Sequence, residues 1–231
     1  MSLFEWKTNL TKASLKNILL KRCTRRSKTT CDAVGKQCRA LNKKTKKFES
    51  AINRAYVRDE IIGSRTLHLL LATNKVTKKS EGFLVGSVKT LPHNKQKVFY
   101  IDLVCSAHRK GRDLLTRAEI YALSLGYSTI GLRAATPALL NIYRRRGFKR
   151  DVDACKKRTR TQRRALRHMD VVASKLFQQG SRSGWQTSGE GWWMSKCTAT
   201  GIRSAKAYVR KQPDRTELAK QLNRGIRKMK K

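Results

Sequence analysis

Between residues 67 and 105, apolar runs separated by polar turns predict three β-strands. Residues 67–73 form a short apolar run, and residues 82–88 form a second one after a polar turn, as in a β-hairpin. Residues 98–105 are rich in aromatic and β-branched side chains, which makes them the strongest strand signal in the chain. The pattern therefore predicts a sheet that includes a hairpin.

The segment that follows has the period of an amphipathic helix. Its apolar face consists of Leu114, Leu115, Ala118, Tyr121, Ala122 and Leu125. Gly126 stands where a C′ glycine commonly ends a helix. The sequence thus predicts a helix directly after the strongest strand.

The alternation of strands and helices continues to about residue 150. Residues 128–132 predict a strand, and the pair Thr136–Pro137 predicts the start of a second helix, with a hydroxyl cap and a proline in the first turn. Gly147 is expected to end that helix, and a further strand is expected from Phe148. Such alternation predicts an α/β fold.

The two ends of the chain are more polar and more basic than this middle part. Residues 1–60 keep helical spacing only in patches and predict a basic, mostly helical extension. Residues 61–200 are expected to form the main domain, with a basic helical insertion near 156–190 and a final strand at 192–197. Residues 201–231 predict a basic helical tail.

Within the two basic segments near the C-terminus, the helical signals are local. Residues 156–179 have an apolar face opposite a basic one. Asp214 and Glu217 resemble a capping box at the start of the last helix.

The net charge of the chain adds most to what these elements indicate about function. The chain has 54 Lys and Arg residues against 15 Asp and Glu, a formal net charge of +39. A protein of this charge attracts polyanions, so nucleic acid or another polyanion is the expected partner. The excess is spread along the chain and is densest after residue 148, so the sequence alone indicates no confined patch.

The cysteine spacing favours no metal site. Six cysteines occur, none in a C-x-x-C pair and none with a histidine at zinc-finger spacing. We expect free thiols in a reducing compartment. The alternative is a metal site at Cys23, Cys31 and Cys38. The first residues lack the apolar run of a signal peptide, and no run approaches ~20 apolar residues. These features predict an intracellular protein of the cytoplasm or nucleus, or one packaged in a particle, without a membrane span.

Residues 105–115 carry the clearest candidate chemistry. There the strongest strand passes through a short basic loop into the amphipathic helix. The first N–H groups of a helix are unpaired and lie at the positive end of its dipole, so they bind phosphate well. Gly111 permits close approach of a ligand, and Arg109, Lys110 and Arg112 add positive charge.

The order of motifs around this loop resembles that of GNAT-superfamily N-acetyltransferases. Leu114–Leu115, Gly126–Tyr127, the strand at 128–133 and Tyr143–Phe148 follow one another with compatible spacing. The sequence pattern is similar to that of divergent family members from large DNA viruses. The resemblance covers residues 67–155 and implies a mixed central sheet flanked by helices, with acetyl-CoA as the acetyl donor.

The resemblance also implies roles for individual residues. The coenzyme pyrophosphate is expected on the loop amides, and a strand N–H is expected to polarise the thioester carbonyl. The residues at these positions are Leu103, Val104, Cys105, His108, Arg109, Lys110, Gly111, Arg112 and Asp113. Cys105 is expected to be a packed thiol, because the family needs no nucleophile. No residue is expected to bind a metal.

Two further residues are candidate catalytic groups. Tyr143 matches the family's general acid; the alternative is a packed helix aromatic. Asp102 is the carboxylate of the central strand and is a candidate general base; the alternative is a structural role. Ser106 and Arg109 depart from the family's loop pattern.

Two functions follow from these observations. The first is an N-acetyltransferase that acts on a protein lysine or another amine, near nucleic acid. The second is a non-catalytic, basic nucleic-acid-binding or virion structural protein built on a degenerate form of the same fold. The charge of +39 repels free cationic acceptors, so acceptors held on nucleic acid fit the first function better.

Overall fold

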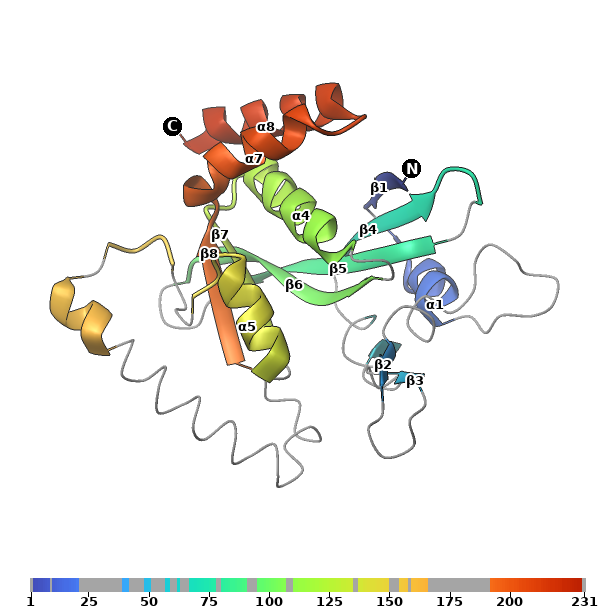
Figure 1. Cartoon of the computed structure of the whole chain (residues 1–231), viewed down its shortest axis with the longest axis horizontal. Coiled ribbons are helices and arrows are strands. Elements are labelled where there is room, and N and C mark those ends of the chain that lie inside the picture. The colour runs from blue at the N-terminus through green and yellow to red at the C-terminus, as the bar shows by residue number, and fades with distance from the viewer. Residues whose placement is uncertain are drawn as a thin grey trace. The chain divides into compact units, whose positions relative to one another are not determined.

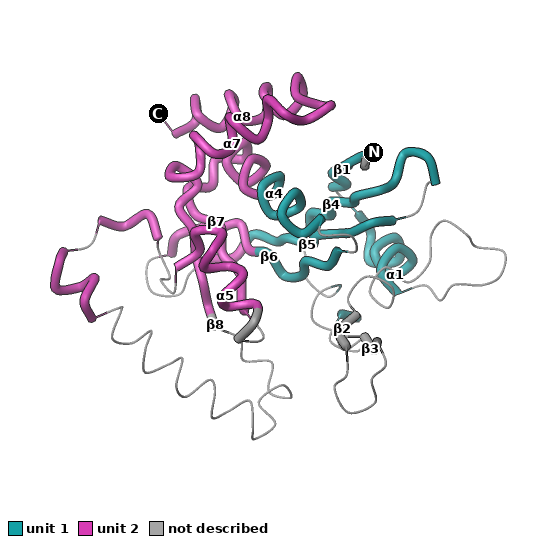
Figure 2. Tube along the Cα trace, in the orientation of Figure 1, with its two compact units in different colours: residues 1–88, 101–118 teal, residues 89–100, 119–231 magenta. Residues whose placement is uncertain are grey.

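A computed structural model describes most of the chain as two compact units (Figure 2). The described residues are 2–8, 10–20, 39–41, 48–50, 57–58, 62, 67–77, 80–90, 95–106, 110–134, 137–149, 154–157, 159–165 and 192–229. Unit 1 consists of residues 1–88 and 101–118, and unit 2 of residues 89–100 and 119–231.

A six-stranded sheet and several helices make up the fold (Figure 1). In sheet order the strands are β1 (Ser2–Lys7), β4 (Leu67–Asn74), β5 (Ser80–Thr90), β6 (Lys97–Ser106), β7 (Thr129–Ala134) and β8 (Trp192–Cys197). A separate pair consists of β2 (Arg39–Leu41) and β3 (Phe48–Ser50). The helices are α1 (Lys12–Leu20), α4 (Gly111–Leu125), α5 (Pro137–Arg145), the 3-10 helix η3 (Thr198–Gly201), α7 (Ile202–Arg210) and α8 (Arg215–Met229).

The sheet contains both kinds of strand pairing. The pairs β1–β4, β4–β5 and β7–β8 are antiparallel. The neighbours β6 and β7 are instead joined through α4, the kind of crossover that parallel strands need. The predicted α/β class is therefore confirmed, and the order β6, α4, β7, α5 is the order that the motifs predicted.

Unit 1 contains an apolar core to which α1, β4, β5 and the second half of β6 contribute. Its buried members are Leu15, Leu19, Val57, Ile62, Leu67, Leu69, Phe83, Val85, Leu103 and Cys105. Strand β1 extends this sheet beyond β4, and the guanidinium of Arg117 lies 4.0 Å from the centre of the Phe4 ring. Arg117 is almost fully buried, so this cation–π contact is shielded from water.

Two glycines with positive φ follow the ends of α4 and α5. Gly126 follows α4 with a φ of 96°, and Gly147 follows α5 with a φ of 85°. An L side chain rarely adopts this backbone conformation, whereas glycine does so without strain. Both helix ends lie where the sequence predicted them.

The C-terminal helices α7 and α8 pack on α4 through a second apolar cluster. Its buried members are Ile120, Leu123, Ala205, Val209, Leu218 and Leu222. The start of α8 is confirmed, because the N–H of Leu218 donates to the carbonyl of Asp214 at 3.2 Å. None of the described helices is both long and apolar enough to span a membrane.

Three details differ from the sequence pattern. Residues 2–7 form strand β1, in the part of the chain that was expected to be mostly helical. No further strand begins at Phe148: Lys149 forms an isolated bridge to Ser195, with both backbone hydrogen bonds at 2.8 Å. Of the predicted helix at 156–179, residues 160–165 are helical, and the part after residue 165 lies outside the described residues.

Candidate functional site

Strand β6 carries the candidate residues that precede the loop. Leu103 and Cys105 are buried, whereas Asp102 and Val104 are half-buried, as the period of a strand requires. The Oδ2 atom of Asp102 is nevertheless buried. The strand thus holds one carboxylate in its second half, in unit 1.

The first turn of α4 directly follows the loop. The first helical hydrogen bond described there runs from the N–H of Leu114 to the carbonyl of Lys110, at 3.1 Å. The N–H groups of residues 111–113 precede this bond and are therefore not used within the helix. Arg112 is exposed beside them. Ala107, His108 and Arg109 lie outside the described residues.

Gly82 of β5 holds the end of β6 close to this turn. A Cβ atom on Gly82 would lie 3.0 Å from the carbonyl oxygen of Cys105, 3.0 Å from Cδ1 of Leu114 and 3.1 Å from Cβ of Ser106. A Cβ atom on Gly111 would lie 3.2 Å from Oγ of Ser106. Both glycines therefore allow strand end and helix start to approach closely. Sequence reasoning found Gly111 but missed Gly82, because the contact joins residues distant in the chain.

The prediction of free thiols is wrong for the three cysteines described. Cys155 and Cys197 form a disulfide with a Cα–Cα distance of 4.7 Å, and Cys105 is also disulfide-bonded. Cys105 is thus buried in a bonded form rather than as a packed thiol. Sequence spacing could not reveal the Cys155–Cys197 pair, because 42 positions separate its members. The alternative metal site at residues 23–38 lies outside the described residues.

Tyr143 lies on α5, in unit 2. Its side chain is only 6% exposed and packs against Phe148, with 6.0 Å between the ring centres. Burial raises the pKa of Tyr143 to about 12. The phenol is therefore protonated at every physiological pH, as a general acid must be before it acts.

An aromatic stack stands at the other side of β7 from α4. Tyr100 and Trp193 stack with 5.0 Å between their ring centres, and the Nζ atom of Lys89 lies 3.7 Å from the centre of the Tyr100 ring. Gly131 gives the stack room, because a Cβ atom there would lie 3.0 Å from Cζ2 of Trp193. These contacts give Trp193 a packing role in unit 2.

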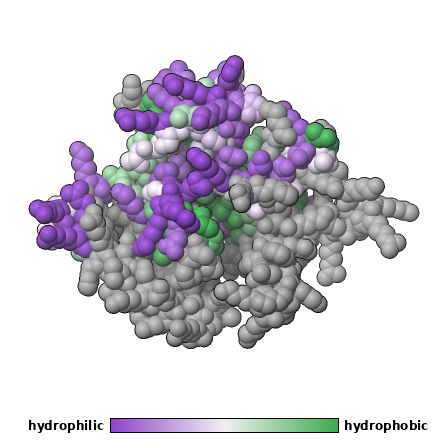
Figure 3. Space-filling model, in the orientation of Figure 1, coloured by the Kyte–Doolittle hydropathy of each residue, from purple (hydrophilic) through white to green (hydrophobic). Residues whose placement is uncertain are grey.

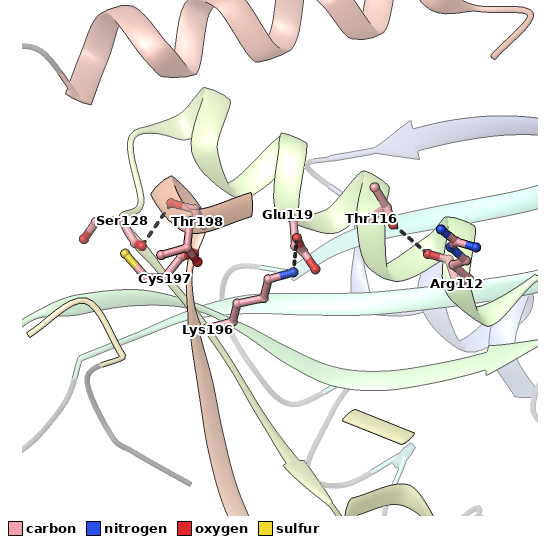
Figure 4. A network of polar contacts seen from close by, with 8 residues as sticks. Arg112, Thr116, Glu119, Ser128, Lys196, Cys197 and Thr198 are labelled. Atoms are coloured by element: carbon pink, nitrogen blue, oxygen red, sulfur yellow. Dashed lines mark hydrogen bonds and ion pairs between the residues drawn. The ribbon is translucent and has the colours of Figure 1, made fainter. Parts of the chain in front are cut away.

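Sequence reasoning also missed a buried ion pair in unit 2 (Figure 4). Lys196 of β8 reaches Glu119 of α4, with Nζ 2.7 Å from Oε2. The pKa of Glu119 is raised by burial, against the opposing charges of Lys196 and Arg146. Nearby, the hydroxyl of Thr198 donates to the carbonyl of Ser128 at 2.9 Å, which ties η3 to the residue directly before β7. The ion pair fixes β8 against α4.

Among the residues that the structure describes, no cluster of three or more His, Cys, Asp or Glu side chains could hold a metal ion. The described candidates offer backbone amides, the carboxylates of Asp102 and Asp113, the phenol of Tyr143 and the positive charges of Lys110 and Arg112.

No protein-family model and no curated protein sequence matches the chain. Solved structures do show a partial likeness. A chain of the KacTA–DNA complex has a TM-score of 0.43 at 9% identity, with 91% of this chain and 100% of that chain covered. A transcriptional regulator from Bacillus halodurans C-125 has a TM-score of 0.39 at 19% identity, with 69% and 100% covered.

Glucosamine-6-phosphate N-acetyltransferase from Arabidopsis thaliana has a TM-score of 0.33 at 13% identity, with 40% of this chain and 66% of that chain covered. Acetyltransferases thus occur among the structures that are similar to this chain. TM-scores and identities this low carry no conclusion about what the chain binds or catalyses.

Proposed function

We propose that the chain is an N-acetyltransferase of the GNAT type, which moves the acetyl group of acetyl-CoA to an amine. The observation that supports this most is the close junction of β6 and α4 in unit 1. There the N–H groups of residues 111–113, which have no acceptor within α4 itself, stand beside a strand end that Gly82 packs tightly. The junction lies at the position where the motif order predicts the pyrophosphate site.

The pyrophosphate is proposed to accept hydrogen bonds from these N–H groups. The partial positive charge of the α4 N-terminus and the exposed side chain of Arg112 would stabilise it. His108, Arg109 and Lys110 complete the proposed loop, as the motif order predicts, and Asp113 lies in the first turn. Strand residues Leu103, Val104 and Cys105 would present the backbone that the thioester carbonyl contacts.

The proposed reaction is a direct transfer. The ammonium loses a proton, the amine nitrogen forms a bond to the thioester carbon, and the carbon–sulfur bond breaks. The leaving thiolate takes up a proton, and the nitrogen gives up its second proton, through water, to the group that protonated the thiolate. Asp102 is proposed to accept the proton that the ammonium loses, and Tyr143 to supply the proton that the thiolate gains. The phenol of Tyr143 is protonated before the reaction begins, as a general acid must be, but its raised pKa makes it a weaker proton donor than an ordinary tyrosine. This role therefore rests on the motif order.

Calorimetric titration of the full chain with acetyl-CoA tests this proposal. Arg112→Glu is the informative variant, because Arg112 is exposed in the first helical turn and a carboxylate there stabilises the helix but repels a pyrophosphate. We expect its Kd to rise about tenfold or more, which corresponds to about 1.4 kcal/mol. Lys16→Glu makes the same change of charge at an exposed position of α1 and should leave Kd unchanged.

Turnover of Tyr143→Phe completes the test. A loss of about 10²-fold or more in kcat with an unchanged coenzyme Kd is expected for a general acid. Absence of saturable heat at millimolar coenzyme in the unsubstituted chain would refute the transferase. It would favour the second candidate, a non-catalytic polyanion-binding protein, which the net charge of +39 supports.

The acceptor is proposed to be an amine already held on a polyanion, such as a protein lysine near nucleic acid. A chain of this charge repels a free cation at long range. Rates on a basic peptide should therefore rise when DNA is added. Flat or falling rates would contradict this choice of acceptor without affecting the coenzyme titration.

A further inference from the structure

The helical hairpin of α7 and α8 has one apolar face and one basic face. The apolar face is fully used: Ala205 and Val209 of α7, with Leu218 and Leu222 of α8, pack against α4. Gly225 brings α8 very close to α4, because a Cβ atom there would lie 2.5 Å from Cγ of Leu123. The orientation of both helices is therefore fixed by packing, and so is the face that they turn outward.

The outward face carries lysine and arginine at helical spacing. We define the basic face as six exposed residues: Arg203, Lys206 and Arg210 of α7, and Lys220, Arg224 and Arg227 of α8. Spacings of three and four positions place each trio on one side of its helix. Figure 3 shows hydrophilic side chains gathered over these two helices.

Few acidic groups offset this charge. Residues 202–229 contain nine Lys and Arg residues and two acids, Asp214 and Glu217. Both acids lie at the start of α8, and Glu217 is hydrogen-bonded to Gln221 at 3.4 Å. The positive potential of the hairpin is therefore concentrated beyond the first turn of α8 and along α7.

We propose that the basic face binds the phosphate backbone of duplex nucleic acid. Guanidinium and ammonium groups make charge-assisted hydrogen bonds to phosphate, and they release counterions from the duplex when they do so. Ser204 and Asn223 are exposed among the six basic residues and add neutral donors for phosphate oxygens. This proposal is independent of the transferase activity, because it uses neither the β6–α4 junction nor Tyr143.

An anionic membrane surface is the other polyanion to consider. The hairpin lacks the free apolar face that binding to a membrane needs. A helix that lies in a membrane interface inserts an apolar face. Here the apolar face is occupied by α4, and none of the large exposed apolar side chains in the described residues belongs to α7 or α8. Attraction to lipid headgroups would thus rest on charge alone.

Single-stranded nucleic acid is disfavoured for a related reason. Proteins that bind single strands stack bases on exposed aromatic rings. Tyr208 is the one aromatic residue of the hairpin, and it packs against the buried cluster that joins the hairpin to α4. A rigid surface of charges without such rings suits the regular phosphates of a duplex.

The test compares two triple variants of the full chain that remove the same charge. The first replaces Lys220, Arg224 and Arg227 by glutamine. The control replaces Lys12, Lys16 and Lys75 by glutamine, three lysines that are equally exposed but lie in unit 1. Fluorescence anisotropy with a short DNA duplex, over a series of salt concentrations, gives the affinity and its salt dependence.

We expect the α8 variant to lose about tenfold or more in affinity. The slope of log K against log salt should fall by about 2 to 3, since each lost phosphate contact removes about 0.9. The control variant should keep nearly the full slope. If circular dichroism shows that the α8 variant unfolds, the same substitutions at Arg203, Lys206 and Arg210 replace it.

Three results would overturn the proposal. Equal losses in the two variants would mean that charge acts diffusely over the whole chain. Equal affinity for single-stranded and duplex DNA would remove the duplex assignment. A larger effect of the α8 substitutions on binding to anionic phospholipid vesicles than on binding to DNA would make a membrane the partner.

Discussion

The Nζ atom of Lys196 lies 2.7 Å from the Oε2 atom of Glu119, so an ion pair joins β8 to the middle of α4. The two side chains are only 14% and 12% exposed. Removing one partner of such a pair leaves the other charge buried without compensation, which costs far more than losing an exposed pair. The pair is therefore a point at which stability and pH are linked.

Lys196→Met should destabilise the fold by about 3 to 5 kcal/mol near neutral pH, measured by urea unfolding. Burial already holds the pKa of Glu119 above its ordinary value, and loss of Lys196 raises it further. A raised carboxyl pKa contributes stability at low pH that is lost as pH rises through the folded pKa. The free energy of unfolding of the variant should thus be closer to that of the unsubstituted chain at about pH 5 than at about pH 8.

The double variant Lys196→Met, Glu119→Leu is the control for this prediction. It removes both charges, so it should recover most of the lost stability and show no extra dependence on pH. A double variant as unstable as the single one would show that packing, rather than the uncompensated carboxylate, is responsible.

Gly225→Ala should destabilise the C-terminal hairpin even though alanine favours helices. In an open helix the change would stabilise by about 0.5 to 1 kcal/mol. Here the new Cβ atom would meet Leu123, with its backbone carbon and oxygen both at 2.7 Å, so α8 must shift away from α4. We expect a net loss of about 1 to 3 kcal/mol and faster proteolysis of residues 202–229.

Asn223→Ala provides the comparison on the same helix. Asn223 is exposed, so this change should be neutral or slightly stabilising. Equal stability of the two variants would contradict the close contact between α8 and α4.

Much of the fold was predictable because the signals are local. The strands from residue 67 to residue 106 follow from alternation and β-branched side chains, and Gly126 and Gly147 mark helix ends through their positive φ. Strand β1 was missed because its pairing with β4 is made across more than sixty intervening residues. Pairings of this kind depend on tertiary contacts that a local pattern does not contain.

The candidate site was predictable only in part, for the same reason. Gly111 is visible from the strand–helix pattern, whereas Gly82 acts through a contact with Cys105 that only the fold creates. The pair Lys196–Glu119 likewise joins residues 77 positions apart. Spacing predicted chemistry along one segment, but not which distant segment supports it.

The buried phenol of Tyr143 should ionise well above the ordinary pKa of a tyrosine. Its pKa of about 12 arises from burial, which disfavours the phenolate. The stabilisation from the neutral phenol is fully present below about pH 10 and is lost between about pH 10 and pH 12. Tyr143→Phe should therefore lose less stability over that interval than the unsubstituted chain does, in chemical denaturation at each pH.

The same pKa sets an expectation for activity. Tyr143 stays protonated below about pH 10, so a fall in kcat at lower pH must come from another group. Suppose that kcat of the unsubstituted chain falls at alkaline pH with a midpoint near pH 8, and that this fall is absent in Tyr143→Phe. The pKa of Tyr143 would then be much lower than its burial implies. Difference absorbance of tyrosinate, compared between the two proteins, gives the pKa directly.

The disulfide between Cys155 and Cys197 should contribute measurably to stability. It closes a loop of 42 positions, and loop-closure entropy for that length corresponds to about 4 kcal/mol at 25 °C. The variant with both cysteines replaced by alanine should lose a large part of this in urea unfolding without reductant, which leaves the disulfide of Cys105 intact in both proteins. Reductant should lower the Tm of the unsubstituted chain by more than it lowers that of the variant, because only the unsubstituted chain has the Cys155–Cys197 bond to lose. Mass spectrometry of alkylated peptides identifies the bond, and quantitative alkylation of both cysteines in the native, unreduced protein would contradict it and restore the prediction of free thiols.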